Sequence, residues 1–261
     1  MSADVAGLIP VLLPPGLDPW AALVLTIVSF FTSALTVSVG IGGGVALLAL
    51  MGYLVPVASI IPVHGVVQLG SNVGRAAILR DHVAWTCLAA FLVGAIPGAW
   101  AGGIAVGALA EPVLRAALGA FILVLTWMPL PRLAAIRLPG FALTGAVTTF
   151  LTMLFGATGP FNAVVLSKTF PDRLRFQATM SAVMSLQHLV KTLAFALAGF
   201  AFAPWLPLIA AMIVTGLMGT WVGANILRRT PERRFQLLFK ICLTVLALDL
   251  VRRGVAGMAH G

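Results

Sequence analysis

The stretch SVGIGGGVALLALMGYLVP, from Ser38 to Pro56, decides the fold of this chain. It follows the apolar run Trp20–Val39 and packs four glycines into the five positions from Gly40 to Gly44. A loop rich in glycine binds phosphate in soluble nucleotide-binding proteins, where it lies between a strand and a helix. Here the glycines join two apolar segments, so their meaning depends on the solvent that surrounds the chain.

The composition indicates that this solvent is lipid. Of the 261 residues, 61% are hydrophobic and 9% are charged, whereas soluble domains carry about 25% charged residues. Apolar segments long enough to cross ~30 Å of hydrocarbon recur along the chain. The clearest are Trp20–Val39, Trp85–Val106, Pro112–Met128 and Leu206–Ile226. We therefore predict an all-α, polytopic membrane protein with one transmembrane domain over residues 1–261, and nucleotide binding is disfavoured.

The chain contains an internal repeat. An offset of 116 residues aligns Gly40–Gly43 with Gly156–Gly159. The same offset aligns Ser71, Asn72 and Arg75 with Gln187, His188 and Lys191. Because transporters are often built from such repeats, we predict two homologous halves, about 15–130 and 135–253.

Each half has the same order of predicted segments. A long apolar span is followed by a glycine break and a short piece, either Val45–Val55 or Phe161–Phe170. At 1.5 Å per residue these pieces reach at most ~17 Å, about half the hydrocarbon thickness, so we expect half-helices near the midplane. A helix with polar residues comes next, and two spans complete each half. The segments not yet given are Pro62–Leu79, Phe141–Phe155, Phe176–Phe200 and Phe235–Val251.

Clusters of basic residues predict the topology. Eleven of the sixteen Lys and Arg residues fall in four clusters, which the positive-inside rule places in the cytoplasm. Each half then crosses an odd number of times, so the halves are inverted and both termini lie outside. This also explains the net charge of +9 without nucleic acid. The clusters are Arg75/Arg80, Arg132/Arg137, Lys168/Arg173/Arg175 and Arg228/Arg229/Arg233/Arg234, while Arg252 and Arg253 go against the rule.

The glycine breaks predict an anion site. A glycine turn lets the backbone approach closely and leaves unpaired N–H groups at the start of the next helix, where partial positive charge attracts anions. In a membrane such backbone is tolerated only inside protein or beside a wet cavity. The alternative is that the glycines serve only close helix packing. The predicted backbone donors are Gly42, Gly43, Gly44, Thr158 and Gly159.

Two helices carry polar side chains on one face. In PVHGVVQLGSNVGRAAILR these are His64, Gln68, Ser71, Asn72 and Arg75, and in FQATMSAVMSLQHLVKTLAF they include Gln177, Ser181, Gln187, His188 and Lys191. Ionisable groups inside a membrane are costly and by default mark a pathway. Lys191 lies in mid-helix with no acidic residue on the same helix, so we predict an anionic substrate as its counter-ion.

Other interpretations of these residues stay open. Arg75 could be an interfacial anchor, because it lies only five residues from Arg80, and the polar faces could simply hydrogen-bond the helices to each other. An enzyme is not predicted, because the seven acidic residues are scattered at segment ends. His64 and His188 are too few ligands to predict a metal, and no cofactor is predicted.

The glycine breaks, the two polar helices and the segments PGAWAGG (97–103) and GTWVGA (219–224) resemble the sulfite exporter TauE/SafE family of bacterial membrane transporters. The likeness covers nearly the whole chain. It implies transport, commonly outward, of sulfite, sulfonates or related sulfur-containing anions across the inner membrane. Two departures bear on the substrate: His64-Gly65-Val66 replaces a G-T-S-like segment, and the second glycine motif ends in Gly159-Pro160.

The residues and the resemblance together predict a multi-pass exporter of a small sulfur-containing anion such as sulfite or sulfoacetate. A passive anion channel, or a transporter of another organic anion such as a carboxylate, is the alternative. The sequence leaves two properties open. The coupling ion could be a proton that binds His188, and the oligomer could be a homodimer. In the predicted site Arg75 and Lys191 supply charge, and Gln68, Ser71, Asn72, Gln187 and His188 orient the oxyanion.

Overall fold

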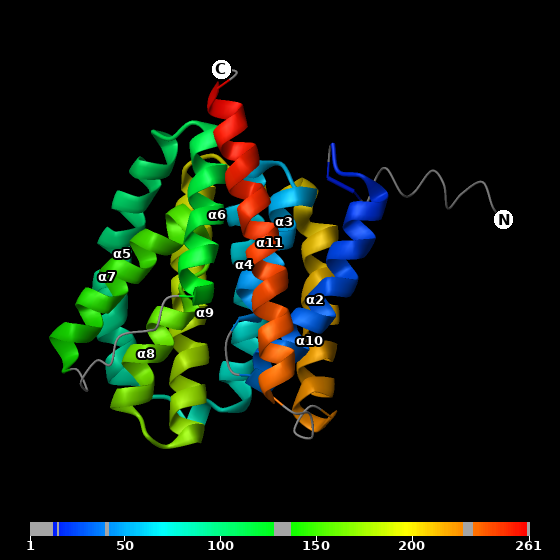
Figure 1. Cartoon of the computed structure of the whole chain (residues 1–261). Helices are drawn as coiled ribbons and strands as arrows, with labels where there is room; N and C mark the ends of the chain where they lie inside the picture. The colour runs from blue at the N-terminus through cyan, green and yellow to red at the C-terminus, as the bar shows by residue number, and fades with distance from the viewer. Residues whose placement is uncertain (1–12, 15, 40–41, 128–136, 227–231, 260–261) are drawn as a thin grey trace.

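The computed structural model describes residues 13–14, 16–39, 42–127, 137–226 and 232–259. These residues form ten α-helices and two short 3-10 helices, and they contain no strand (Figure 1). Five of the helices are long and apolar enough to cross a membrane. The predicted all-helical membrane fold is therefore confirmed.

The helices follow the order predicted for two halves. The first half consists of α2 (Pro19–Val39), α3 (Gly43–Leu54), α4 (Val57–Ile78), η1 (Arg80–His82), α5 (Trp85–Gly107) and α6 (Glu111–Trp127). The second consists of α7 (Leu138–Phe155), α8 (Gly159–Thr169), α9 (Arg173–Leu197), η2 (Ala203–Trp205), α10 (Leu206–Ile226) and α11 (Glu232–Ala259).

Helices α4 and α11 extend furthest beyond their predicted bounds. Helix α4 begins at Val57 and runs through Pro62, because a membrane helix tolerates a proline whose freed carbonyl is satisfied by its surroundings. Helix α11 continues past Val251 to Ala259. Its last turns are supported by Asp249, whose carboxylate binds Arg252 at 2.6 Å and Arg253 at 2.7 Å. These are the two arginines that go against the positive-inside rule, and each is paired with the same acid.

The long spans pack mainly across the two halves. Helix α5 lies along α7, and α2 lies along α10, so each pair joins one helix of each half. Glycines allow this close approach: Gly94 and Gly98 of α5 lie against the backbone carbonyls of Ala142 and Ala146. On the other pair, Gly219 and Gly223 of α10 lie against the carbonyls of α2. The small-residue packing expected in membranes thus holds the halves together.

Two further pairs of long helices consist of counterparts from the two halves. Helix α4 packs against α9, and α6 packs against α11. The backbone N–H of Ala84, beyond the end of α4, donates to Thr179 near the start of α9, whereas His64 near the start of α4 lies beside His188. On α6 and α11, Gly119 lies against Ala247, whereas Pro112 at the start of α6 lies against Gly254, further along α11. Both pairs are therefore antiparallel.

Replacing Gly94 with alanine is expected to lower the stability of the protein. The added Cβ would overlap the carbonyl oxygen of Ala142, and overpacking of this kind costs about 1–3 kcal/mol. The matched control is Gly107→Ala at the end of the same helix, where no heavy atom lies within 4 Å of the added Cβ. Thermal melting in detergent should show a lower Tm for Gly94→Ala alone; equal melting of both variants would contradict the proposed packing.

Candidate functional site

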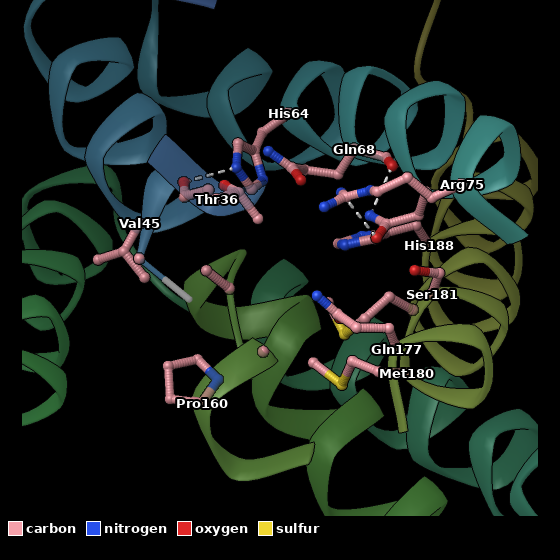
Figure 2. A pocket seen from close by; sticks show the side chains of 16 residues that line it. Thr36, Val45, His64, Gln68, Arg75, Pro160, Gln177, Met180, Ser181 and His188 are labelled. Carbon is pink, nitrogen blue, oxygen red and sulfur yellow. Dashed lines mark hydrogen bonds between the residues drawn. The ribbon is translucent and has the colours of Figure 1, made fainter. Parts of the chain in front are cut away.

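A small cavity lies where the two short helices begin. Its volume is about 70 Å³, enough for a few waters or one small anion, since a single water needs roughly 10–15 Å³ on this measure. Figure 2 shows side chains from both halves of the chain around this space. The wall consists of Thr36, Gly42, Gly44, Val45, His64, Gln68, Asn72, Arg75, Ala157, Gly159, Pro160, Gln177, Met180, Ser181, Met184 and His188.

The N-termini of α3 and α8 both face the cavity. Gly42 precedes α3 with φ 109°, a left-handed conformation that glycine adopts without strain. Helix α8 begins at Gly159, after Thr158. Neither helix start is capped by a side chain, so its N–H groups are not occupied by a local acceptor. Two helix dipoles thus direct partial positive charge at one space, as the glycine breaks predicted.

Two stripes of side chains line the cavity at equivalent positions of the repeat. The α4 stripe is His64, Gln68 and Asn72, and the α9 stripe is Met180, Met184 and His188. Each α9 residue lies 116 positions after its α4 counterpart, and within each stripe the residues are four apart, as a helix requires. The α4 stripe is polar throughout, whereas the α9 stripe carries two thioethers, so the walls differ chemically.

Arg75 is the charged residue on the cavity wall. Its guanidinium donates to the side-chain oxygen of Asn72 at 3.1 Å and to the carbonyl of Ser71 at 3.4 Å. Both partners of Arg75, an amide oxygen and a backbone carbonyl, are neutral. None of the described wall residues is acidic. Figure 2 shows Arg75 next to His188, opposite Val45 and Pro160. The positive charge of the cavity is therefore not compensated by the protein around it.

Two histidines, one from each half, meet at the cavity. The ring centroids of His64 and His188 lie 6.2 Å apart at nearly right angles, and both rings are buried. Nε2 of His64 lies 2.9 Å from the carbonyl oxygen of Gly44, which can only accept, so this nitrogen carries the proton. Nδ1 of His64 and both ring nitrogens of His188 have no hydrogen-bond partner among the described residues. These three buried nitrogens are therefore unsatisfied by the part of the protein that the structure describes.

Seven of the twelve predicted site residues lie on the cavity wall, and five lie behind it. The seven are Gly42, Gly44, Gln68, Asn72, Arg75, Gly159 and His188. Gly43 instead packs against the backbone of Thr32 on α2, and Ser71 faces Gly216 on α10. The contact of Gly43 with α2 therefore fits the alternative interpretation, in which the glycine serves close helix packing, better than it fits a role as an anion donor. The other three residues behind the wall are Thr158, Gln187 and Lys191.

Gln187 ties three helices of the second half together. Its oxygen accepts from Asn162 of α8 at 3.0 Å and from Thr158 at 3.2 Å, and its nitrogen donates to Thr148 of α7 at 3.0 Å. The amide is fully buried, and its oxygen and nitrogen are both used by the protein. Gln187 and Thr158 thus do what the alternative interpretation expected, since they hydrogen-bond helices to each other.

Lys191 is completely buried beside the second glycine break. Its ammonium group donates to the carbonyl oxygen of Gly156 at 3.1 Å. Gly156 ends α7 in the left-handed conformation with φ 79°, and a cation at the C-terminus of a helix is favoured by the helix dipole. The side chain passes close to Gly65 of α4, where a Cβ would come within 2.7 Å of Cε of Lys191. Lys191 therefore bridges the two halves behind the cavity.

Several wall residues were not in the predicted site. His64, Gln177 and Ser181 belong to the predicted polar faces, but they were not assigned to the anion. The two methionines of the α9 stripe are apolar, so a search for polar residues does not find them. They lie 116 positions after His64 and Gln68, so the repeat offset would have identified them. The others are Thr36, Val45, Ala157 and Pro160.

The fold and the cavity define a helical membrane protein of the kind that carries solutes, with half-helices meeting at a central site. The model of the sulfite exporter TauE/SafE family matches residues 25–250, and the chain belongs to this family. It is thus a membrane transporter of the sulfite exporter type. No curated protein and no solved structure gives a significant match to the chain.

Proposed function

We propose that the protein exports a small sulfur-containing anion, sulfite or an organosulfonate such as sulfoacetate, across the bacterial inner membrane. The observation that carries this proposal is the convergence of Arg75 and two uncapped half-helix N-termini on one cavity whose described wall residues include no acid. Such a site attracts anions and repels cations. Membership of the sulfite exporter family supports the sulfur-containing class.

The donors on the wall suit an oxyanion with three acceptor oxygens. The guanidinium of Arg75 offers a charged fork, and the amides of Gln68, Asn72 and Gln177 lie on the same wall. His188, whose two ring nitrogens have no partner among the described residues, is the group on the wall to which we assign coupling to protons. A carboxylate, with two oxygens, would use fewer of these donors.

Binding and flux measurements test this function. Purified protein should be stabilised against heat by sulfite or sulfoacetate, more than by sulfate or a carboxylate such as acetate. In proteoliposomes, uptake of sulfoacetate should saturate with concentration and respond to an imposed pH gradient. A current that rises without saturation would instead indicate a passive channel, and stabilisation by carboxylates alone would overturn the substrate class.

We also propose a multi-pass topology with inverted halves and both termini outside. Support comes from the antiparallel packing of α4 with α9 and of α6 with α11, since these helices are counterparts in the repeat. It places Arg80 at the end of α4 on the same side as Lys168 and Arg175 near the start of α9, in agreement with the positive-inside rule. Of the other two clusters, Arg132, Arg228 and Arg229 lie outside the described residues.

Cysteine labelling should confirm this topology. In a background without Cys87 and Cys242, the variants Asp81→Cys and Ser167→Cys should be shielded from an impermeant maleimide added outside the cell. In the same background Ala110→Cys and Ala201→Cys, in the exposed turns after α5 and α9, should react with it. Labelling of one residue from each pair would instead mean that the two halves are parallel.

A further inference from the structure

The centre of the cavity wall is built from equivalent residues of the two repeats, but beyond this centre the wall continues toward only one end of the helix bundle. The α4 and α9 stripes are equivalent in the repeat, as described above. Beyond these stripes the wall continues along Arg75 of α4 and along Gln177 and Ser181 of α9. These three residues lie toward the end of α4 and the start of α9, the end of the bundle that we assign to the cytoplasm.

The central cavity does not extend to the three positions that are equivalent to these residues in the repeat. Under the repeat offset of 116 residues, Arg75 corresponds to Lys191, and Gln177 and Ser181 correspond to Ile61 and Gly65. None of the corresponding residues lines the cavity. Instead Lys191 fills the space over Gly65, within 2.7 Å of where a Cβ would lie, and Ile61 is 8% exposed. One arm of a two-armed path is thus open, and the other is filled by a lysine side chain.

Space resumes on the far side of Lys191. A second, smaller cavity of about 30 Å³ is lined by Ile61 and by Phe195, one turn beyond Lys191 on α9. It also touches Val57 at the start of α4 and Val106 at the end of α5, so it lies at the opposite end of the bundle from Arg75. On α9 Lys191 thus lies between His188 of the central cavity and Phe195 of this space, and on α4 its contact Gly65 lies between His64 and Ile61.

We infer that Lys191 closes a second anion path, related to the open one by the repeat, and that it forms a second anion-binding position when that path opens. This inference rests on the proposed transport of an anion. With the path closed, the ammonium rests on the carbonyl of Gly156, a neutral partner. No acidic residue on the described cavity walls competes for it, so an anion in the centre is its strongest counter-ion. Arg75 and Lys191 then serve the anion in succession, one on each arm.

The sidedness of two single cysteines tests this directly. In the cysteine-free background, Arg75→Cys should react with an impermeant thiol reagent added from the cytoplasmic side, whereas Lys191→Cys should react faster from outside than from the cytoplasmic side. Reaction of Lys191→Cys from the cytoplasmic side, at a rate like that of Arg75→Cys, would place both cations on one arm and overturn the inference. The assay needs no anion, so its outcome is independent of which anion is carried or whether sulfoacetate binds.

A second measurement uses a reporter next to the closure. Ile61→Cys should be protected from an impermeant reagent added on the cytoplasmic side while Lys191 is present, because Lys191 lies between Ile61 and the central cavity, and its labelling rate from that side should rise several-fold when Lys191→Ala is added. The matched control is Lys168→Ala, which removes a lysine from the exposed end of α8 and should leave Ile61→Cys protected. Unchanged protection in a Lys191→Ala protein that elutes as a single folded species would overturn the closure by Lys191.

Discussion

Replacing Arg75 with glutamine is expected to weaken binding of the anion by roughly 10- to 100-fold, the equivalent of losing one charge-assisted hydrogen bond of about 1.5–3 kcal/mol. Glutamine is shorter and neutral, so Asn72 loses its donor, whereas the carbonyl of Ser71 can still accept from the amide, which lies near the position of Nε. The positive charge on the wall is lost. Calorimetric titration of sulfite or sulfoacetate into the purified variant gives the dissociation constant.

The matched control for Arg75 is Arg80→Gln. Arg80 lies five residues further on, in η1, and its side chain is 77% exposed and close to Asp81. Its replacement should therefore leave the affinity unchanged. Equal loss of affinity in both variants would mean that the charge acts at long range. An unchanged affinity in Arg75→Gln would return Arg75 to the role of an interfacial anchor.

Replacing Lys191 with methionine is expected to separate binding from transport. Methionine has nearly the volume of lysine and leaves the cavity wall unchanged, because the ammonium lies on Gly156 and not on that wall. Affinity measured as above should therefore stay within about threefold of the wild type, a change below 1 kcal/mol. Flux into proteoliposomes should be abolished, because the second cation of the path is missing.

This expectation departs from the single site predicted from the sequence, in which Lys191 binds the anion together with Arg75. If Lys191→Met lost affinity to the same extent as Arg75→Gln, the single site would be correct. The stability of the variant is a separate observable. Removing a buried charge favours the folded protein, but the carbonyl of Gly156 loses its donor; a Tm near that of the wild type would show that these effects nearly cancel.

The helices could be predicted because the solvent imposes strong rules. Apolar length identified spans such as α5 and α10 almost to the residue, and the short α3 and α8 followed from glycine breaks in apolar sequence. The start of α4 was missed because Pro62 was taken as a helix start, although lipid tolerates proline within a helix. The end of α11 was missed because its charged last turns, held by Asp249, have the composition of a loop.

The site was predicted in outline but not side chain by side chain. Neighbouring residues on a helix point about 100° apart, so the pairs Ser71/Asn72 and Gln187/His188 could not both face one cavity. The structure turns Asn72 and His188 to the cavity, and their neighbours face other helices. Sequence spacing does not decide between such neighbours, because the choice depends on how the other helices pack.

The cross-half packing of the long spans has a consequence for how the protein is made. During synthesis α2, which ends at Val39, reaches the membrane long before α10, the helix along which α2 packs, which begins at Leu206. Until then the faces of α2 and α5 that pack against α10 and α7 are without their partner helices. The nascent first half must therefore persist as a loosely associated set of inserted helices, and compact structure arises late, when the second half closes over it.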